Sequence, residues 1–249
     1  MPERTIVLRI KRRERASVEP YWEEFEIPYK AQHNVISMLM EIRRNPVNRD
    51  GKATTPVTWE SNCLEEVCGA CTMVINGRVR QACTALADNL PQPITIEPMS
   101  KFPLIRDLWV DRSSMFESLK KAHNWIAIDG TYDLGPGPRV RSEVQELAYL
   151  FSRCMTCGCC LEACPQVNPH SKFMGAAVIG QVYLMGQHPT GAMHQDERLE
   201  AMMGEGGVAD CGNAQNCVEV CPKDIPLTTA IGDVGRQVSL KWLRDIFWK

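Results

Sequence analysis

Apolar and polar residues alternate near the start of the chain, and this two-residue period predicts β-strands. Thr5 to Ile10 and Tyr21 to Ile27 follow it, and the charged residues between them fit the tip of a hairpin. The apolar spacing then changes to that of a helix with one buried face. Because Asn34 can cap such a helix, we predict one from Val35 to Arg44.

A second hairpin is predicted at Asn76-Gly77, a dipeptide that favours two-residue turns between strands. Thr72 to Ile75 and Arg78 to Ala82 flank it, and Pro93 to Pro98 reads as a last short strand. The second half of the chain has helical apolar spacing or composition. It predicts helices over Ser142 to Ser152, Lys172 to Met185, Glu197 to Met203 and Thr228 to Trp248. Strands followed by helices indicate the α+β class.

Composition narrows the possible functions. The chain has 249 residues, 44% of them hydrophobic and 23% charged, and its net charge is −2. This length suggests two domains or one large one. The composition excludes a disordered chain and a generally basic nucleic-acid-binding protein. We interpret the basic residues near the start as a solvated hairpin and expect no nucleic-acid partner; they are Arg4, Arg9, Lys11, Arg12, Arg13 and Arg15.

The cysteines are the unusual feature, because the chain has twelve of them in three groups. No apolar segment precedes the first charges, and no run of about 18 apolar residues could span a membrane. We therefore expect a cytosol-facing chain in a reducing compartment, where regularly spaced cysteines indicate metal rather than disulfides. A long stretch without cysteine follows the first group and predicts a domain boundary there.

The first group, Cys63, Cys68, Cys71 and Cys83, has the spacing C-x4-C-x2-C-x11-C. Its first three members have the plant-type ferredoxin spacing of a 2Fe-2S cluster. The small residues between Cys68 and Cys71 let backbone N–H groups approach the sulfurs. A zinc site, which also takes four thiolates, is the alternative, but such sites favour C-x2-C pairs.

The second group contains Cys154, Cys157, Cys160 and Cys164, followed by a proline. This C-x2-C-x2-C-x3-C-P run is that of bacterial ferredoxins, in which the fourth cysteine serves the other cluster. Cys159 lies out of register, and we interpret it as a small buried apolar residue.

The third group, Cys211, Cys217 and Cys221, fits the same template with Ala214 in place of its second cysteine. In paired runs of this kind, the fourth cysteine of each run binds the cluster of the other run, which we call the crossing rule. By this rule, Cys221 completes a 4Fe-4S cluster with Cys154, Cys157 and Cys160. Cys164 then joins Cys211 and Cys217. Since alanine cannot bind iron, we predict a 3Fe-4S cluster at this site. A four-iron cluster with water or another side chain at that corner is the alternative.

Three clusters in one chain indicate electron transfer rather than catalysis, because clusters pass single electrons. The chain has no glycine-rich dinucleotide loop after a strand and no P-loop. The histidines form no ligand-spaced pair, so we assign no catalytic residue and no histidine ligand.

At these residues the chain resembles the iron–sulfur subunits of succinate dehydrogenase and fumarate reductase. The resemblance covers nearly the whole length. It rests on the first cysteine group, on FPLIRDLWVD at Phe102 to Asp111, on CMTCGCCLEACP, and on CGNAQNCVEVCPKDIPL. The missing cysteine of the last run is typical of that family.

The resemblance implies a fold and an electron-transfer chain. Residues 1–105 would form a β-grasp, plant-type ferredoxin domain, and residues 106–249 an all-α, bacterial-type ferredoxin domain. A flavoprotein partner would oxidise succinate at FAD. Electrons would pass through the 2Fe-2S, 4Fe-4S and 3Fe-4S clusters to a quinone at a cytochrome b membrane-anchor subunit. The chain would lie at the cytoplasmic face of the membrane, with FAD and haem only on its partners.

The resemblance is weaker at the quinone site. Ubiquinone-using members often have Pro-Ser-x-Trp-Trp after the cysteine that matches Cys164, whereas here only Pro165 matches. A histidine often follows the cysteine that matches Cys211, and here it is Gly212. We therefore place only Pro165 near the quinone. The surrounding sequence resembles Gram-positive enzymes, which use menaquinone.

Three alternative functions remain, and the sequence argues against two of them. A fumarate reductase subunit would pass electrons in the reverse direction, which the sequence does not distinguish. An iron–sulfur subunit of another flavoprotein oxidase would lack the first cysteine group. A structural zinc protein that binds nucleic acid is opposed by the net charge.

The C-terminal segment LKWLRDIFWK is strongly apolar. Leu240, Leu243 and Phe247 share one helical face, with Trp242, Ile246 and Trp248 nearby. Since large exposed apolar patches usually mark contacts, we predict contact with the flavoprotein or the membrane anchor. The alternative is packing on its own domain.

Overall fold

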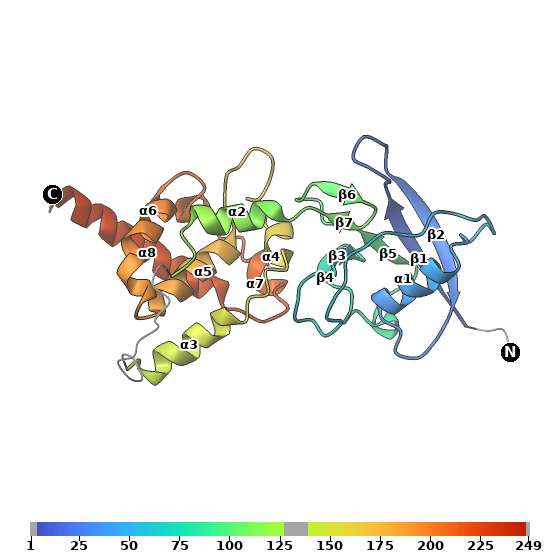
Figure 1. Ribbon diagram of the computed structural model, residues 1–249, viewed down its shortest axis with the longest axis horizontal. Coiled ribbons are helices and arrows are strands. Elements are labelled where there is room, and N and C mark those ends of the chain that lie inside the picture. Colours follow the sequence, from blue (N-terminus) through green and yellow to red (C-terminus); the bar gives the residue numbers. More distant parts are fainter. Residues whose placement is uncertain (1–3, 127–138, 248–249) are drawn as a thin grey trace. The chain divides into compact units, whose positions relative to one another are not determined.

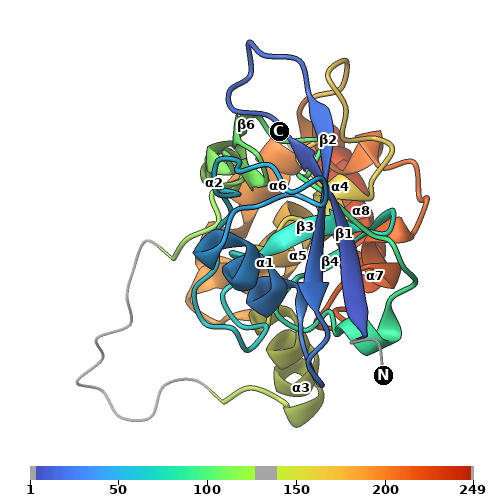
Figure 2. The same ribbon diagram turned by 90° about the vertical axis from the view of Figure 1, so that its right-hand side faces the viewer.

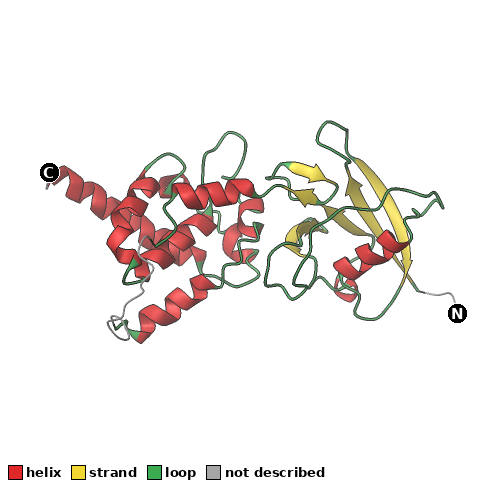
Figure 3. Ribbon diagram, in the orientation of Figure 1, coloured by secondary structure: helices red, strands yellow, loops and turns green. Residues whose placement is uncertain are grey.

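The computed structural model describes residues 4–126 and 139–247 (Figure 1). The chain forms two compact units. Unit 1 comprises Met1–Arg112 and Met155–Glu162, and unit 2 comprises Ser113–Cys154 and Ala163–Lys249. Unit 1 holds the strands, and unit 2 is helical (Figure 3). The predicted α+β class is confirmed, and the domain boundary predicted near residue 105 stays a prediction.

Unit 1 contains seven described strands, two described α-helices and one described 3-10 turn. Their bounds are β1 Thr5–Arg12, β2 Tyr21–Pro28, α1 Val35–Arg44, β3 Thr72–Ile75, β4 Arg78–Gln81, η1 Ala87–Asn89, β5 Ile94–Glu97, β6 Leu104–Arg106, β7 Trp109–Val110 and α4 Cys159–Glu162. Five strands form one sheet in the order β2-β1-β5-β3-β4, and β6 and β7 form a separate hairpin. Strands β1 and β5 are parallel, and the other pairs of the large sheet are antiparallel.

The core of unit 1 lies between the large sheet and helix α1 (Figure 2). Ile6, Leu8 and Ile10 alternate along β1 and are completely buried. The alternation predicted from the sequence thus corresponds to one buried face of the strand. Fixing this face also fixes the register of the strand, because a one-residue shift would turn every apolar side chain outward.

Local sequence signals fix the ends of two elements. Asn34 Oδ1 accepts the backbone N–H of Ser37 at 2.8 Å, and Ser37 Oγ accepts that of Asn34 at 3.0 Å. This reciprocal capping box starts helix α1 at the predicted residue. At the β3–β4 turn, Asn76 and Gly77 have φ angles of 48° and 75°. A type I′ turn needs such left-handed angles at both residues, so the predicted hairpin is confirmed.

The solvated hairpin predicted for the first strands is wrong at one residue. Arg12 is completely buried. Its guanidinium pairs with Asp107 at 2.9 Å and with Glu23 at 2.6 Å. Asp107 Oδ2 also accepts the backbone N–H of Thr58 at 3.0 Å. The buried ion pair therefore joins β1 to the segment that precedes the first cysteine group. The basic pattern could not reveal this, because the partner carboxylate lies 95 residues away.

Unit 2 consists of helices around α5. The bounds are α2 Ser113–Lys121, α3 Ser142–Ser152, α5 Ala176–Gln187, η2 Gly191–His194, α6 Gln195–Met203, η3 Val208–Asp210, α7 Asn216–Glu219 and α8 Leu227–Phe247. Each of the four predicted helices is present; Trp248, the predicted end of the last one, lies outside the described residues. Helix α5 starts four residues later than predicted, because Gly175 at its N-cap has a φ of 92°. Helices α2, α4 and α7 and the β6–β7 hairpin were not predicted.

Candidate metal centres

The first three cysteines of the first group lie in a loop of unit 1, and backbone N–H groups of this loop point toward the sulfurs of Cys63 and Cys68. Cys63 Sγ accepts backbone N–H groups of Glu65, Val67 and Cys68 at 3.2 to 3.4 Å. Cys68 Sγ accepts two more, from Cys63 at 3.5 Å and from Ala70 at 3.4 Å. Left-handed φ angles at Leu64, Glu66 and Gly69 produce this winding.

These hydrogen bonds set the chemistry of the sulfurs. The three backbone donors lower the pKa of Cys63 to about 7, because they stabilise the thiolate. Burial raises the pKa of Cys71 to about 12. Cys83, predicted as the fourth ligand, directly follows β4 and is also buried. A loop that aims five N–H groups at two sulfurs fits a thiolate-bound iron–sulfur cluster, which needs such donors to tune its potential.

The middle part of the second cysteine run, Met155–Glu162, belongs to unit 1, contains α4 and packs on the loop of the first cysteine group. A Cβ atom built on Gly69 would lie 2.8 Å from Cys157 Cα and 2.9 Å from the Met155 carbonyl oxygen. Only glycine permits this approach. The loop that carries Cys68 and Cys71 therefore touches the segment that carries Cys157.

Cys159 is completely buried beside this contact, as its interpretation as a small buried residue requires. It also makes polar contacts that the sequence analysis did not predict. Gln81 Nε2 donates to Cys159 Sγ at 3.5 Å and to Thr72 Oγ1 at 2.8 Å. A hydrogen bond with Cys157, together with burial, raises the pKa of Cys159. The same hydrogen bond lowers the pKa of Cys157 to about 7.

The predicted 4Fe-4S ligands are divided between the units. Cys157 and Cys160 belong to unit 1, and Cys154 and Cys221 belong to unit 2. Their assignment to one cluster therefore rests on the sequence spacing and stays a prediction.

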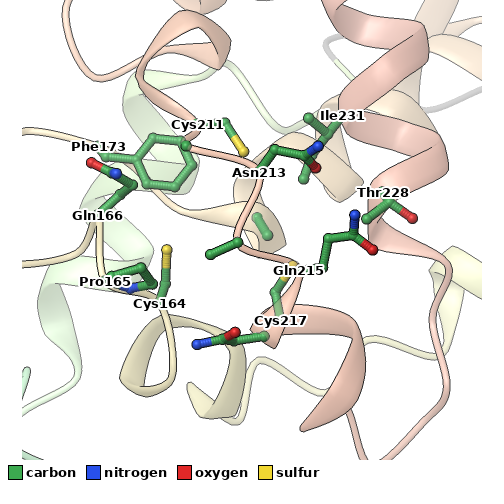
Figure 4. A pocket seen from close by; sticks show the side chains of 14 residues that line it. Cys164, Pro165, Gln166, Phe173, Cys211, Asn213, Gln215, Cys217, Thr228 and Ile231 are labelled. Carbon is green, nitrogen blue, oxygen red and sulfur yellow. The ribbon is translucent and has the colours of Figure 1, made fainter.

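The predicted 3Fe-4S ligands line one pocket of unit 2 (Figure 4). Cys164, Cys211 and Cys217 line it together with Ala214. The pocket holds about 370 Å³ of space, including its mouth. Burial raises the pKa of Cys217, and the nearby Cys164 and Cys211 raise it further. Three neighbouring thiols with an alanine beside them fit a cluster that lacks one protein ligand.

The rest of this pocket comes from two loops and from helices α5, α7 and α8. Asn213 and Gln215 have left-handed φ angles of 51° and 63°, so the loop bends sharply on each side of Ala214. Asn216 Nδ2 donates to the Ala163 carbonyl oxygen at 2.9 Å and joins this loop to the second cysteine run. Pro165, predicted near the quinone, also lines the pocket.

Comparison with known proteins also gives a 2Fe-2S domain followed by a 4Fe-4S domain. Residues 5–117 match the 2Fe-2S iron-sulfur cluster binding domain, and residues 150–225 match the 4Fe-4S dicluster domain. The succinate dehydrogenase iron-sulfur subunit of Bacillus subtilis (strain 168) is 63% identical over 98% of this chain and 97% of its own length. The chain belongs to the family of succinate dehydrogenase and fumarate reductase iron–sulfur subunits.

More distant relatives are similar over most of the chain, and a solved structure shares its fold. The fumarate reductase iron-sulfur subunit of Mycobacterium tuberculosis is 31% identical over 91% of this chain and 90% of its own length. That of Wolinella succinogenes is 28% identical over 88% of this chain and 90% of its own. A chain of the Mycobacterium smegmatis Sdh1 complex in the apo form shares the fold, with a TM-score of 0.79 at 24% identity; the match covers 99% of this chain and 98% of that one.

These findings confirm the predicted family, and they confirm that the chain carries 2Fe-2S and 4Fe-4S cluster-binding domains. It is a subunit of an oxidoreductase complex and has other subunits as partners. None of the helices in the described part of the chain has the length and hydropathy of a membrane span.

Two polar residues near the sulfurs were missed by the sequence analysis. Gln81 occupies a completely buried position next to Cys71 and Cys159. A polar residue two positions before Cys83 was the available signal. Arg112 contacts the first cysteine loop from the end of the β6–β7 hairpin. No local signal identifies it, because the contact depends on the fold.

Proposed function

We propose that this chain is the electron-transfer subunit of a succinate:quinone oxidoreductase. The observation that carries the proposal is the 63% identity, over nearly both full lengths, to the succinate dehydrogenase iron-sulfur subunit of Bacillus subtilis. Electrons pass from FAD of a flavoprotein partner through three clusters to a membrane quinone. Menaquinone is the proposed acceptor, since the ubiquinone-type motif is missing after Cys164.

The cluster ligands are proposed residue by residue. Cys63, Cys68, Cys71 and Cys83 hold the 2Fe-2S cluster, and their loop supplies the N–H donors described above. Cys154, Cys157, Cys160 and Cys221 hold the 4Fe-4S cluster. Cys164, Cys211 and Cys217 hold the 3Fe-4S cluster, which their shared pocket supports.

The partners and the location follow from the chemistry of the acceptor. A quinone dissolved in the membrane requires a membrane-bound site, which we assign to a cytochrome b anchor subunit carrying any haem. The chain then lies on the cytoplasmic face of the cell membrane, held by that anchor. The exposed apolar end of helix α8 supports such a contact.

The test is an EPR spectrum of the intact complex, reduced first with succinate and then with dithionite. Signals of three distinct clusters, at least one of them reduced by succinate, are the expected result. A purified complex without iron or acid-labile sulfide, or with clusters that succinate never reduces, contradicts the proposal.

A quinol:fumarate reductase is the second candidate, because the Mycobacterium tuberculosis and Wolinella succinogenes relatives carry that name. The rates of succinate oxidation with quinone and of fumarate reduction with quinol, measured on one preparation, decide the direction. If the chain belongs to a dehydrogenase, the rate of succinate oxidation with quinone must be high enough to support growth on succinate.

A further inference from the structure

Arg112 links the first cysteine loop to an acidic side chain in unit 1. Its Nη1 donates to the Gly69 carbonyl oxygen at 2.7 Å, and its Nη2 pairs with Glu60 Oε2 at 2.9 Å. The side chain is only 16% exposed, whereas that of Glu60 is 38% exposed. A planar guanidinium can hold both partners at once, and the partial burial strengthens both contacts.

The residue that Arg112 holds is the one that touches the second cysteine run. Gly69 lies between Cys68 and Cys71, and its backbone is packed on Cys157 and on the Met155 carbonyl. The cation therefore lies where the proposed 2Fe-2S and 4Fe-4S ligand segments meet.

We propose that Arg112 is a positioning residue for electron transfer between the 2Fe-2S and 4Fe-4S sites: it fixes Gly69 against the Cys157 segment and raises the reduction potentials there. The inference rests on the proposed function. The transfer moves one electron from one cluster to the next and neither forms nor breaks a bond. A short, fixed path between the two ligand segments favours it.

The sign of the effect follows from charge. Reduction adds one negative charge to a cluster, and a nearby cation stabilises that charge. Glu60 partly offsets the cation. Loss of the Arg112 charge should therefore lower the potentials, and loss of the Glu60 charge should raise them. A purely structural role predicts otherwise, because both substitutions break the same ion pair and should act in the same direction.

The experiment compares Arg112→Gln and Glu60→Gln in the intact complex. Each cluster is titrated with redox mediators and followed by EPR. In Arg112→Gln we expect the potential of one or both clusters to fall enough to change the electron distribution about tenfold, or about 59 mV for a one-electron couple. In Glu60→Gln we expect a smaller shift of the opposite sign.

Two further variants separate the effect of the Arg112 charge from the effect of its two contacts and from that of a change in the net charge of the chain. Arg112→Lys keeps the cation but cannot hold both partners, so its potentials should stay near those of the unmodified complex while transfer between the clusters slows. Arg49→Gln is the control, because Arg49 pairs with Glu24 and Glu26 on the surface and its loss changes the net charge equally. We expect its potentials to be unchanged.

The outcomes distinguish this inference from the proposed function. Unchanged potentials in Arg112→Gln with all clusters present, or shifts of the same sign in Arg112→Gln and Glu60→Gln, overturn the inference alone. If Arg112→Gln does not assemble its clusters, Glu60→Gln decides by itself, and a fall or no change refutes the role of charge. Absence of clusters from the unmodified complex contradicts the proposed function instead.

Discussion

At the scale of single residues, a buried ion pair organises the approach to the first cluster loop. Arg12 and Asp107 are both completely buried, and Asp107 also accepts backbone N–H groups of Arg13 and Thr58. The Arg12 guanidinium donates to the Thr55 carbonyl oxygen at 3.1 Å. The pair therefore fixes the segment that leads to Cys63.

Asp107→Ala is expected to destabilise the chain strongly, because it leaves the Arg12 charge buried without its main partner. Removing one member of a buried pair costs about 3–5 kcal/mol, which lowers the midpoint of thermal unfolding by at least about 6 °C in a chain of this size. Differential scanning fluorimetry of the purified complex measures it. The control is Glu24→Gln, at an exposed ion pair, which should leave the midpoint unchanged.

Ala214 decides the cluster type at the pocket of Cys164, Cys211 and Cys217. Ala214→Cys restores the four-cysteine spacing, so we expect a 4Fe-4S cluster with a lower potential and slower electron delivery to quinone. Succinate oxidation with an artificial acceptor that takes electrons at the flavin should persist. The readout is EPR of the air-oxidised protein, in which a three-iron cluster is paramagnetic and an oxidised four-iron cluster is silent.

Ala214→Val is the matched control, since its side chain is close in size to that of cysteine but has no atom that binds iron, so the three-iron signal should stay in place. An undiminished three-iron signal in Ala214→Cys, with unchanged quinone reduction, would show that the new thiol points away. The alanine would then not determine the cluster type.

At the scale of elements, helix α8 has two different halves. Its first part buries Leu227, Ala230 and Val234 against unit 2. Its last part exposes large apolar side chains, with Trp242 54% and Phe247 72% exposed. The alternative that this end packs on its own domain is not supported for these side chains. Contact with a partner subunit stays a prediction.

In the assembled complex, the exposed apolar side chains would be buried against the partner subunit, and deleting residues 241–249 removes that burial. We therefore expect the deletion to reduce assembly of the membrane complex about tenfold. A tenfold change corresponds to a free energy of about 1.4 kcal/mol, which is less than the free energy gained by burying one large apolar side chain. Succinate:quinone activity of washed membranes and the amount of bound subunit measure it. An intact, fully active membrane complex would refute the prediction.

A milder pair of variants gives the control for that experiment. Leu243→Glu places a charge on the same face without shortening the helix and should also weaken assembly. Tyr149→Glu changes an apolar residue of α3 that is 62% exposed and should not. Equal losses in both variants would indicate a general effect of added charge.

At the scale of the whole molecule, the proposed clusters tie together distant parts of the chain. The crossing rule assigns Cys221 to the run that starts at Cys154, and Cys164 to the run that starts at Cys211. The pocket of Cys164, Cys211 and Cys217 agrees with the second half of this rule. The first half remains to be tested by substitution.

Cys221→Ser is expected to damage the 4Fe-4S cluster, whereas Cys159→Ser should leave all three clusters in place. Serine at position 159 can still contact Gln81 and Cys157, and the crossing rule gives Cys159 to neither run. Iron and sulfide content together with EPR of the dithionite-reduced complex measure both. Loss of the four-iron signal in Cys159→Ser, with retention in Cys221→Ser, would reverse the assignment.

The sequence by itself determined the features that depend on neighbouring residues. Asn34 and Ser37 make the capping box, Asn76-Gly77 makes the turn, and the alternation of Ile6, Leu8 and Ile10 makes a strand with one buried face. The cysteine spacings belong to the same class, because a cluster must be wrapped by a short loop of fixed length. Such signals survive in the sequence since the interacting groups are only a few residues apart.

Only the tertiary structure decided which distant groups meet. Three contacts join residues that are 43 to 95 positions apart in the sequence. They are the ion pair of Arg12 with Asp107, the hydrogen bond of Gln81 to Cys159 and that of Arg112 to the Gly69 carbonyl oxygen. No local pattern encodes them, because an isolated Arg or Gln has the same appearance in a sequence whether it is solvated or buried. Their partners are set by the packing of the sheet, the β6–β7 hairpin and the cysteine loops in space.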